Sequence, residues 1–269
     1  MKSINQIRRE VAARRPLIHC ITNPISINQC ANAVLSVGAR PIMAEHPMEV
    51  AEITSTAGAL LLNLGNITDV RMESMGISLR AAREKGVPVV LDMVGISCSK
   101  LRRKYVNELL GIAVPALIKG NYSEINALYN ESYHSSGVDA DSALNVCVID
   151  SVTVELAKKY GTIVLASGKT DVITDGSKLL HINNGTEQLA AVTGTGCMQG
   201  ALCAAYLSAD DGIYSTAAAC AVLGIAGQLS KTEAGSGTFM VKLLDMLSTM
   251  KDAELEEYLN MEEIRIEDI

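Results

Sequence analysis

The chain contains 269 residues, of which 48% are hydrophobic and only 3% aromatic, and its formal net charge is −7. Because nucleic-acid binding relies on clustered Lys and Arg and often on aromatic platforms, this composition argues against a DNA- or RNA-binding protein. Single α/β domains often reach about 250 residues, so we expect residues 1–269 to form one domain with a large aliphatic core.

The cysteines indicate a reducing compartment, and the pattern of apolar residues indicates no membrane-spanning helix. The chain has seven cysteines, several within apolar helical patterns, which is typical of reduced thiols and not of a disulfide framework. Residues 1–15 are polar and charged, and no uninterrupted apolar run approaches the roughly 18 residues of a membrane helix. We therefore expect a cytoplasmic protein with no membrane partner.

Short apolar runs alternate with longer amphipathic segments along the first part of the chain. This alternation is the pattern of βαβ units, in which helices cover a parallel sheet. Ser3 and Gln6 have the spacing of a capping box for a first helix, and Gly38, Gly86 and Gly161 stand where helices should end. The expected strands cover residues 17–21, 41–44, 60–64, 87–91, 116–118 and 162–165.

The pattern changes after the last of these strands. Residues 171–174 and 178–182 flank an Asp-Gly pair, which is a strong signal for a β-hairpin with a type I′ turn, so the sheet should be mixed. Residues 196–247 are almost wholly helical in pattern, and the acidic residues 252–269 are expected to add a short helix against a neighbour. We therefore predict an α/β fold with a mostly parallel central sheet and a helix-rich carboxyl-terminal half.

Residues 192–200, with the sequence VTGTGCMQG, form a glycine-containing loop that leads into a helix. Glycines such as Gly194 let backbone N–H groups approach an anion, and the helix terminus adds partial positive charge, although a tight turn alone would also explain them. Cys197 lies in the first helical turn, where it is either a candidate base or nucleophile or a small buried side chain. The other six cysteines are expected in the core.

Further polar side chains follow expected strands, where open α/β sheets bind ligands. Asp92, Lys119 and Glu124 supply the carboxylates and the cation that a Mg²⁺-nucleotide site requires. The alternatives are a turn cap for Asp92 and a surface ion pair for the other two. Ser167 either contacts a phosphate or closes a turn, and Asn23 has the donor and acceptor that suit a neutral heterocycle.

Taken together, these segments resemble hydroxyethylthiazole kinases, the thiamine-salvage branch of the ribokinase-like family. Cys197 is characteristic, because the wider family usually carries Asp where this branch carries Cys. The matching motifs extend over nearly the whole chain: TN at 22–23 with Asn28, PIMA at 41–44, GALLLN at 58–63, LD at 91–92, KGN at 119–121 with Glu124, and VTGTGC at 192–197.

The resemblance implies ATP- and Mg²⁺-dependent phosphorylation of the primary alcohol of 4-methyl-5-(2-hydroxyethyl)thiazole on a ribokinase-like three-layer α/β sandwich. It also implies a homotrimer with substrate sites shared between subunits. The implied site roles are Cys197 as a catalytic helper base, Met43, Gly194 and Asn23 at the thiazole, Lys119 and Ser167 at the ATP, and Asp92 and Glu124 as metal-linked carboxylates. For Met43, a core gap-filler is the alternative.

Two positions depart from the family's pattern. Lys119 stands where the family typically has Arg, and it keeps the charge but loses the bidentate fork of a guanidinium. Met93 replaces the Pro that usually follows the aspartate. We therefore expect the phosphate contact and the loop beside Asp92 to differ locally from the family's.

Other functions remain open at this stage. A kinase of the same fold for hydroxymethylpyrimidine or pyridoxal would use the same constellation. Cys197 would instead be the nucleophile of an acyltransferase if His19 or His181 served as its base, although the apolar surroundings of His19 favour a satisfied core residue. A nucleotide-binding sensor without turnover is the third alternative.

Overall fold

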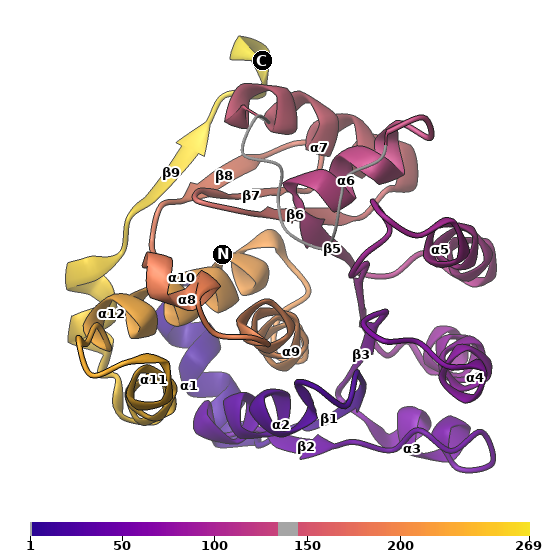
Figure 1. Ribbon diagram of the computed structural model, residues 1–269, viewed down its shortest axis with the longest axis horizontal. Helices are drawn as coiled ribbons and strands as arrows, with labels where there is room; N and C mark the ends of the chain where they lie inside the picture. Colours follow the sequence, from indigo (N-terminus) through magenta and orange to yellow (C-terminus); the bar gives the residue numbers. More distant parts are fainter. Residues whose placement is uncertain (1, 134–144) are drawn as a thin grey trace.

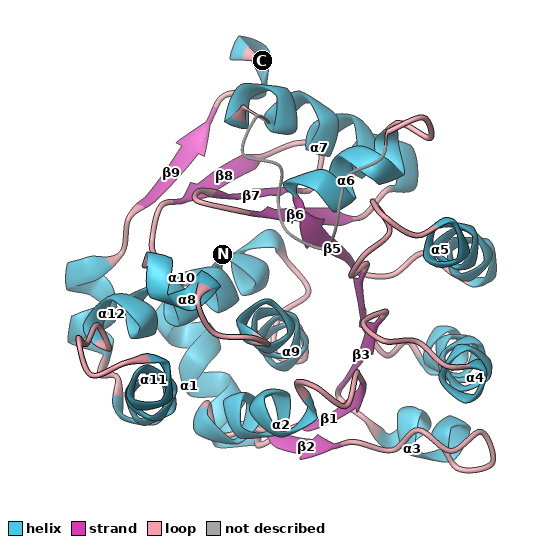
Figure 2. Ribbon diagram, in the orientation of Figure 1, coloured by secondary structure: helices cyan, strands magenta, loops and turns pink. Residues whose placement is uncertain are grey.

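A twisted sheet forms the middle of the molecule, and helices cover both of its faces (Figure 1). The computed structural model describes residues 2–133 and 145–269. Within these residues the chain forms a three-layer α/β sandwich (Figure 2), which confirms the predicted fold class and the helix-rich carboxyl-terminal half.

The described strands have the order β2-β1-β3-β4-β5-β6-β7-β8-β9. The pairs from β2 to β6 are parallel, and those from β6 to β9 are antiparallel, so the sheet is mixed as predicted. The first expected strand matches at both ends, and the other five parallel strands differ at their ends by one to three residues. The bounds are β1 Leu17–Ile21, β2 Arg40–Ile42, β3 Ala59–Asn63, β4 Val89–Asp92, β5 Leu117–Asn121, β6 Ile163–Ser167, β7 Asp171–Thr174, β8 Leu179–Ile182 and β9 Met261–Ile264.

The helices divide between the two faces of the sheet (Figure 1). One face carries α3 Val50–Thr56, α4 Asp69–Lys85, α5 Lys100–Ile112, α6 Tyr122–Tyr129 and α7 Val146–Tyr160. The other side carries α1 Ile4–Arg14, α2 Ile27–Ser36, α8 Glu187–Ala190, α9 Thr195–Leu207, α10 Ile213–Leu229, α11 Ser236–Thr249 and α12 Asp252–Tyr258. No helix in the described ranges has the length and apolar character that a membrane crossing needs.

Each face of the sheet buries its own apolar cluster because side chains alternate along a strand. On β3, Leu61 belongs to the cluster under α9 and α10, whereas Leu60 and Leu62 belong to the cluster under α4 and α5. All three leucines are fully buried. Strands covered on both faces therefore have the continuous apolar sequences expected of a parallel sheet.

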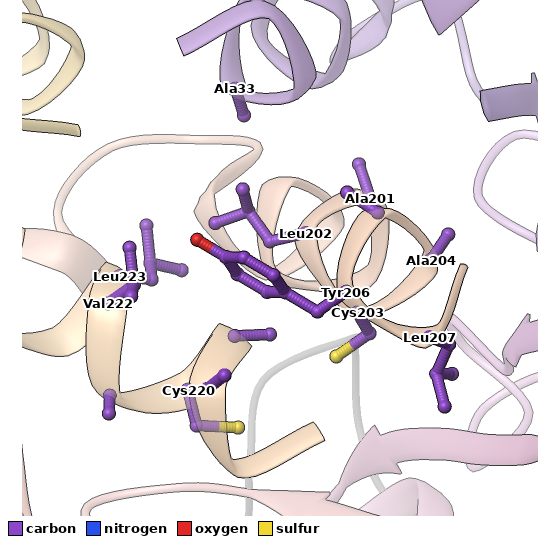
Figure 3. Close-up of a cluster of buried hydrophobic side chains, with 14 of the residues drawn as sticks. Ala33, Ala201, Leu202, Cys203, Ala204, Tyr206, Leu207, Cys220, Val222 and Leu223 are labelled. Carbon is purple, nitrogen blue, oxygen red and sulfur yellow. The ribbon is translucent and has the colours of Figure 1, made fainter. Parts of the chain in front are cut away.

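Small side chains let α9 and α10 pack closely in the carboxyl-terminal half. Figure 3 shows Leu202, Cys203 and Tyr206 of α9 facing Cys220 and Leu223 of α10. Burial raises the pKa of both thiols, which keeps them neutral. These two cysteines are therefore core residues, as expected, in a cluster that contains few aromatic rings.

The seven cysteines are all free thiols, but they do not all share one environment. Cys20 and Cys30 are buried like the pair in the carboxyl-terminal half, whereas Cys98 and Cys147 are exposed. The expectation that all six cysteines outside the site lie in the core is therefore wrong for these two. Cys98 lies in the loop before α5 and Cys147 in the first turn of α7.

The sequence signals for helix ends agree with the structure. Ser3 and Gln6 form the predicted capping box, in which each side chain accepts the other residue's backbone N–H. Gly86 and Gly161 end α4 and α7 in the left-handed region, and Gly38 follows α2 with a φ of 88°. A residue without a Cβ adopts this backbone conformation at little cost, which is why these helices stop there.

The β7–β8 hairpin is present, but its turn is not type I′ as predicted. A type I′ turn needs positive φ at both central residues, and only Gly176 has it, with a φ of 85°. The Asp175 carboxylate instead accepts the backbone N–H groups of Ser177 and Lys178, each at 2.8 Å. The aspartate side chain therefore closes the turn without a second left-handed residue.

The acidic tail forms the expected short helix α12 and then adds a strand that was not predicted. Strand β9 pairs antiparallel with β8, and the backbone N–H of Asn183 donates to the Asn260 carbonyl at 2.9 Å. Because β9 lies at the sheet edge with Glu262 and Glu263 exposed, its sequence has no apolar alternation.

Because α10 approaches the loop after β8 closely at Gly224, we predict that a side chain added at this position destabilises the fold. A Cβ on Gly224 would lie 2.7 Å from the Asn184 carbonyl oxygen. We expect Gly224→Ala to lower the free energy of unfolding by about 1–3 kcal/mol, measured by urea denaturation. Gly111→Ala in α5 is the control, because its Cβ meets nothing within 4 Å; the control should gain stability, and equal effects would contradict the packing.

Candidate active site

Three polar side chains lie side by side across β3, β4 and β5. Asn63 is in register with Asp92, and Asp92 is in register with Lys119. Residues in register on neighbouring parallel strands point to the same face of the sheet. All three are buried, with 0%, 1% and 3% of their surfaces exposed, respectively. We call Asn63, Asp92 and Lys119 the polar row; it places an amide, a carboxylate and an ammonium group at the carboxyl end of the sheet.

Lys119 and Asp92 form a buried ion pair. The Lys119 Nζ lies 3.1 Å from the Asp92 Oδ1. Burial alone would lower the pKa of the Lys119 ammonium, but the negative charge of Asp92 outweighs it and raises that pKa, so the lysine stays charged. The alternative of a surface ion pair is therefore wrong for Lys119. The alternative of a turn cap for Asp92 is also wrong, because its oxygens bind Lys119 and Asn63.

The strand that carries Lys119 is longer than predicted. It was expected to end at Ile118, but β5 pairs with both β4 and β6 and continues to Asn121. The backbone N–H of Met93 donates to the Lys119 carbonyl at 2.8 Å, a bond that a proline could not make. Met93, which stands where the family usually has Pro, therefore links the loop after β4 to the polar row through a backbone hydrogen bond.

Cys197 belongs to α9, in the helical layer that packs on the sheet, and it lies next to the polar row. It is the third residue of α9 and is partly exposed. The side-chain Nδ2 atoms of Asn23 and Asn63 each lie 3.4 Å from its Sγ and donate to it. The structure therefore brings the predicted residues Asn23, Asp92, Lys119 and Cys197 into one hydrogen-bonded group, joined by Asn63.

The two glycines at the start of α9 have different reasons to be glycine: Gly194 has a left-handed backbone, and Gly196 lies beside open space. Gly194 has a φ of 92°, and a Cβ there would lie 3.1 Å from the Cβ of Ser26. A Cβ on Gly196 would meet nothing within 4 Å. The first N–H groups of a helix have no partner within the helix, so the start of α9 presents donors beside this open space. The steric explanation thus holds for Gly194, whereas Gly196 leaves room for a ligand.

Glu124 joins two loops at the edge of the site. Its Oε2 accepts the backbone N–H of Asn121 at 2.7 Å in a capping box, and its Oε1 accepts that of Gly95 at 2.6 Å. Only 4% of Glu124 is exposed, so the surface ion-pair alternative is wrong for this residue too. Burial first, and then the charge of Asp92, raises the pKa of Glu124 to about 7.

Asp92 and Glu124 are the carboxylates that fit a metal ion. In residues 2–133 and 145–269, no three His, Cys, Asp or Glu side chains form a ready-made metal cluster. Mg²⁺ usually takes only one or two carboxylates and fills its other positions with water and substrate phosphates. Two carboxylates that interact electrostatically, with Lys119 as their nearby cation, suit such a partial site.

A cleft of about 1620 Å³ opens beside the start of α9. Ser167 and Gly196 line it, whereas Lys119 is not one of its lining residues. Its volume exceeds the roughly 300–1,000 Å³ of common small-ligand pockets, so a nucleotide would fit. The sequence reasoning missed most of its wall, which includes residues 183–190, residues 231–234 and Lys242.

Asp171 is a buried carboxylate in this cleft that was also missed. Its oxygens accept hydrogen bonds from the Gly168 backbone at 3.1 Å and from Gln199 Nε2 at 2.7 Å. Burial raises the pKa of Asp171 to about 6. The residue begins a strand with the sequence DVIT, which has no feature that would distinguish it from an ordinary strand start.

Met43 lies in the loop after β2, partly exposed, and packs against the cluster under α9. The buried His19 anchors this loop, because its Nε2 lies 2.9 Å from the Ala44 carbonyl and its Nδ1 lies 2.9 Å from Thr54 Oγ1. His19 is thus the satisfied core residue that was expected. His181 pairs with Asp150 at 2.8 Å. Both proposed acyltransferase bases are therefore engaged elsewhere, which disfavours that function.

The fold of the chain resembles that of ribokinase-like proteins. A ribokinase-like superfamily protein from Enterococcus faecalis superposes with a TM-score of 0.65 and 12% identity, covering 96% of this chain and 91% of that one. At this identity the likeness concerns the fold alone, which is ribokinase-like.

Comparisons of the amino-acid sequence then show to which family within this fold the chain belongs. The model of the Hydroxyethylthiazole kinase family matches residues 8–253. Hydroxyethylthiazole kinase 2 of Clostridium botulinum is 44% identical over 92% of this chain and 95% of its own. The structure of a hydroxyethylthiazole kinase protein from Pyrococcus horikoshii superposes with a TM-score of 0.90 and 33% identity, covering 97% of this chain and 99% of that one. The chain belongs to the hydroxyethylthiazole kinase family.

The buried carboxyl of Glu124 predicts a pH-dependent stability. Its pKa rises from 4.5 to about 7 on folding, so its contribution is present below pH 4.5 and is lost as the pH rises through 7. Between these values the unliganded parent should lose stability relative to Glu124→Gln by on the order of 3 kcal/mol, measured by denaturant unfolding at several pH values. The exposed Glu108→Gln controls for a lost charge, and a constant difference between parent and Glu124→Gln would contradict the burial effect.

Proposed function

We propose that this chain transfers the γ-phosphoryl group of ATP to the primary alcohol of 4-methyl-5-(2-hydroxyethyl)thiazole, a step in thiamine salvage. The observation that carries the proposal is the position of Cys197 at the start of α9, hydrogen-bonded to the polar row and close to a cleft of nucleotide size. Membership in the hydroxyethylthiazole kinase family supports this choice of alcohol over hydroxymethylpyrimidine or pyridoxal.

The nucleotide occupies the cleft beside α9 in this proposal. Ser167 lines that cleft and contacts the phosphates, and the buried Lys119 supplies a fixed positive charge. The backbone N–H groups at residues 194–197 stabilise the negative charge that develops during transfer. Because a phosphoryl transition state is loose, positioning and electrostatics provide most of the rate acceleration.

Asp92 and Glu124 would hold Mg²⁺ or its bound waters. The ion, when bound, screens the negative charge of the phosphates. The two carboxylates come from β4 and from the start of α6, and Glu124 is held by two backbone N–H groups. The protein's contribution is therefore to keep two oxygen donors in place before the nucleotide arrives.

Cys197 acts as a helper base for the alcohol proton. Little proton abstraction is needed until late in a loose transition state, so a weak base suffices. Asn23 and Asn63 hold the sulfur by donating to it. In this role the Cys197 thiolate accepts the alcohol proton and becomes a thiol, while the alcohol oxygen bonds to the γ-phosphorus and ADP leaves, so no covalent intermediate forms on the sulfur.

The thiazole ring is held with little aromatic stacking. The chain has no Trp, eight Tyr and a single Phe, and that Phe, Phe239, is buried in the core. Met43 and the Gly194 backbone supply the contacts instead. Asn23 borders this site, but both ends of its amide are used within the protein. Its Oδ1 accepts the N–H groups of Ile25 and Ser26 at 3.1 Å each, and its Nδ2 donates to Asn63 and Cys197.

We also infer a homotrimer with substrate sites between subunits. Two large apolar side chains beside the proposed thiazole site are exposed: Met48, at 90%, and Ile25, at 60%. They follow Met43 and Asn23, respectively, in the loops that border the site. Exposed apolar side chains next to a site are candidates for burial by another subunit.

The direct test of the activity is to incubate the protein with ATP, Mg²⁺ and the thiazole alcohol and to look for the phosphate ester by mass spectrometry. We expect the ester to form, and hydroxymethylpyrimidine and pyridoxal to be phosphorylated far more slowly. No ester with any of the three alcohols would favour the nucleotide-binding sensor.

Replacement of Cys197 tests its role as a helper base. Cys197→Asp keeps an acceptor at the same place and should retain substantial kinase activity, whereas Cys197→Ala should lose about 10²-fold in kcat and keep some turnover. Steady-state kinetics on variants with unchanged Tm provide the measurement. Complete inactivity of a folded Cys197→Asp would count against this role.

Light scattering in solution tests the assembly. The parent should have three times the 28.6 kDa mass of one chain. Met48→Glu should lower this mass and raise the KM for the thiazole alcohol, because the introduced carboxylate would be buried between subunits. Leu101→Glu replaces a side chain that is 56% exposed on α5 and serves as the control. A monomeric parent would contradict the trimer.

A further inference from the structure

We propose that Asn63 is a positioning residue that fixes Cys197 and Asp92 relative to each other. This role rests on the proposed phosphoryl transfer. Asn63 is the last residue of β3, and none of its surface is exposed. Its amide lies between the thiol and the carboxylate and hydrogen-bonds to both.

The orientation of the Asn63 amide is determined by its surroundings. Its Oδ1 accepts the backbone N–H of Gly65 at 2.9 Å and the Nδ2–H of Asn23 at 3.0 Å. A reversed amide would place its own N–H groups against these two donors. The Nδ2 atom must therefore face the other side, where Asp92 and Cys197 lie.

The two N–H groups of this amide serve the two functional side chains. Nδ2 lies 2.7 Å from Asp92 Oδ2 and 3.4 Å from Cys197 Sγ. Lys119 holds the other oxygen of Asp92, so both ends of the carboxylate are fixed. One amide thus sets the distance between the proposed proton acceptor and the proposed metal-linked carboxylate.

Cys197 needs this support because its own surroundings are open. The residue is partly exposed, and its neighbour Gly196 has free space where a side chain would be. Asn23 and Asn63 are the side chains that donate to its sulfur. A displacement of a reacting group by about 1 Å can cost 10²-fold in rate, so losing either donor should reduce turnover.

Two replacements separate the parts of this role. Asn63→Asp keeps the size of the side chain and the acceptor for Gly65, but it replaces the amide N–H groups with a carboxyl oxygen that faces Asp92 and Cys197. Asn63→Ala removes both ends of the amide. For each we expect kcat to fall roughly 10- to 100-fold, while the KM values for ATP and the thiazole alcohol stay within about threefold. An unchanged kcat in both folded variants would overturn the proposal.

A double-mutant cycle distinguishes positioning from general structural support. If Asn63 acts partly through Cys197, the loss from Asn63→Ala should be at least about threefold smaller in a Cys197→Ala background. The control is Asn5→Ala, because Asn5 is also buried and donates to Glu256 at 2.8 Å, far from the site. Asn5→Ala should lower Tm without this dependence. Equal losses from Asn63→Ala in both backgrounds would overturn the link to Cys197.

A readout independent of turnover separates this proposal from the proposed function. Donated hydrogen bonds favour the ionised thiol, which is the form that iodoacetamide alkylates. At pH 7.5 and without ATP, Asn63→Ala, which removes the donor without adding a charge, should slow alkylation of Cys197 at least about threefold, followed by peptide mass spectrometry. The exposed Cys98 in the same sample should react at an unchanged rate.

The outcomes can be told apart. Slower alkylation in a protein that phosphorylates none of the alcohols supports the contact with Asn63 and rejects the proposed kinase activity. Normal kinase activity in the parent, with neither kcat nor alkylation altered in the variants, supports the function and rejects the role of Asn63.

Discussion

The buried ion pair between Lys119 and Asp92 is the interaction on which the rest of the site depends. Breaking such a pair by removing one partner typically costs about 3–5 kcal/mol, because the remaining charge is left without compensation. The pair persists because β4 and β5 are in register and because Asn63 donates to the second carboxylate oxygen. The register of three central strands therefore determines where the charges lie.

The approach of α9 depends on the same pair. Gly200 of α9 packs over Asp92, and a Cβ at that position would lie 3.1 Å from Asp92 Oδ2. This close packing brings the first turn of the helix, with Cys197, to the end of the polar row. The aliphatic, aromatic-poor composition serves the same purpose, since small side chains let α9 and α10 pack closely under the sheet (Figure 3). Composition, helix packing and site geometry are thus linked.

Sequence reasoning predicted the parts of this structure that depend on local pattern. The apolar runs located all six parallel strands, and the glycine loop located the start of α9 and Cys197. It could not predict that Lys119 is buried, because only the register with Asp92 makes a charged residue tolerable inside the sheet. Asn63 was missed as an individual residue for the same reason. The edge strand β9 pairs through its backbone, so its sequence carries no signal.

In the proposed function, the buried pair of Lys119 and Asp92 serves phosphoryl transfer and is not needed for stability alone. Replacing both partners, in Lys119→Met with Asp92→Asn, removes both charges at nearly constant volume, which is often neutral for stability. We predict that this double variant keeps a Tm within a few degrees of the parent, while formation of the thiazole phosphate falls at least about 10³-fold. A folded double variant that still phosphorylates the alcohol at the parent's rate would contradict the account.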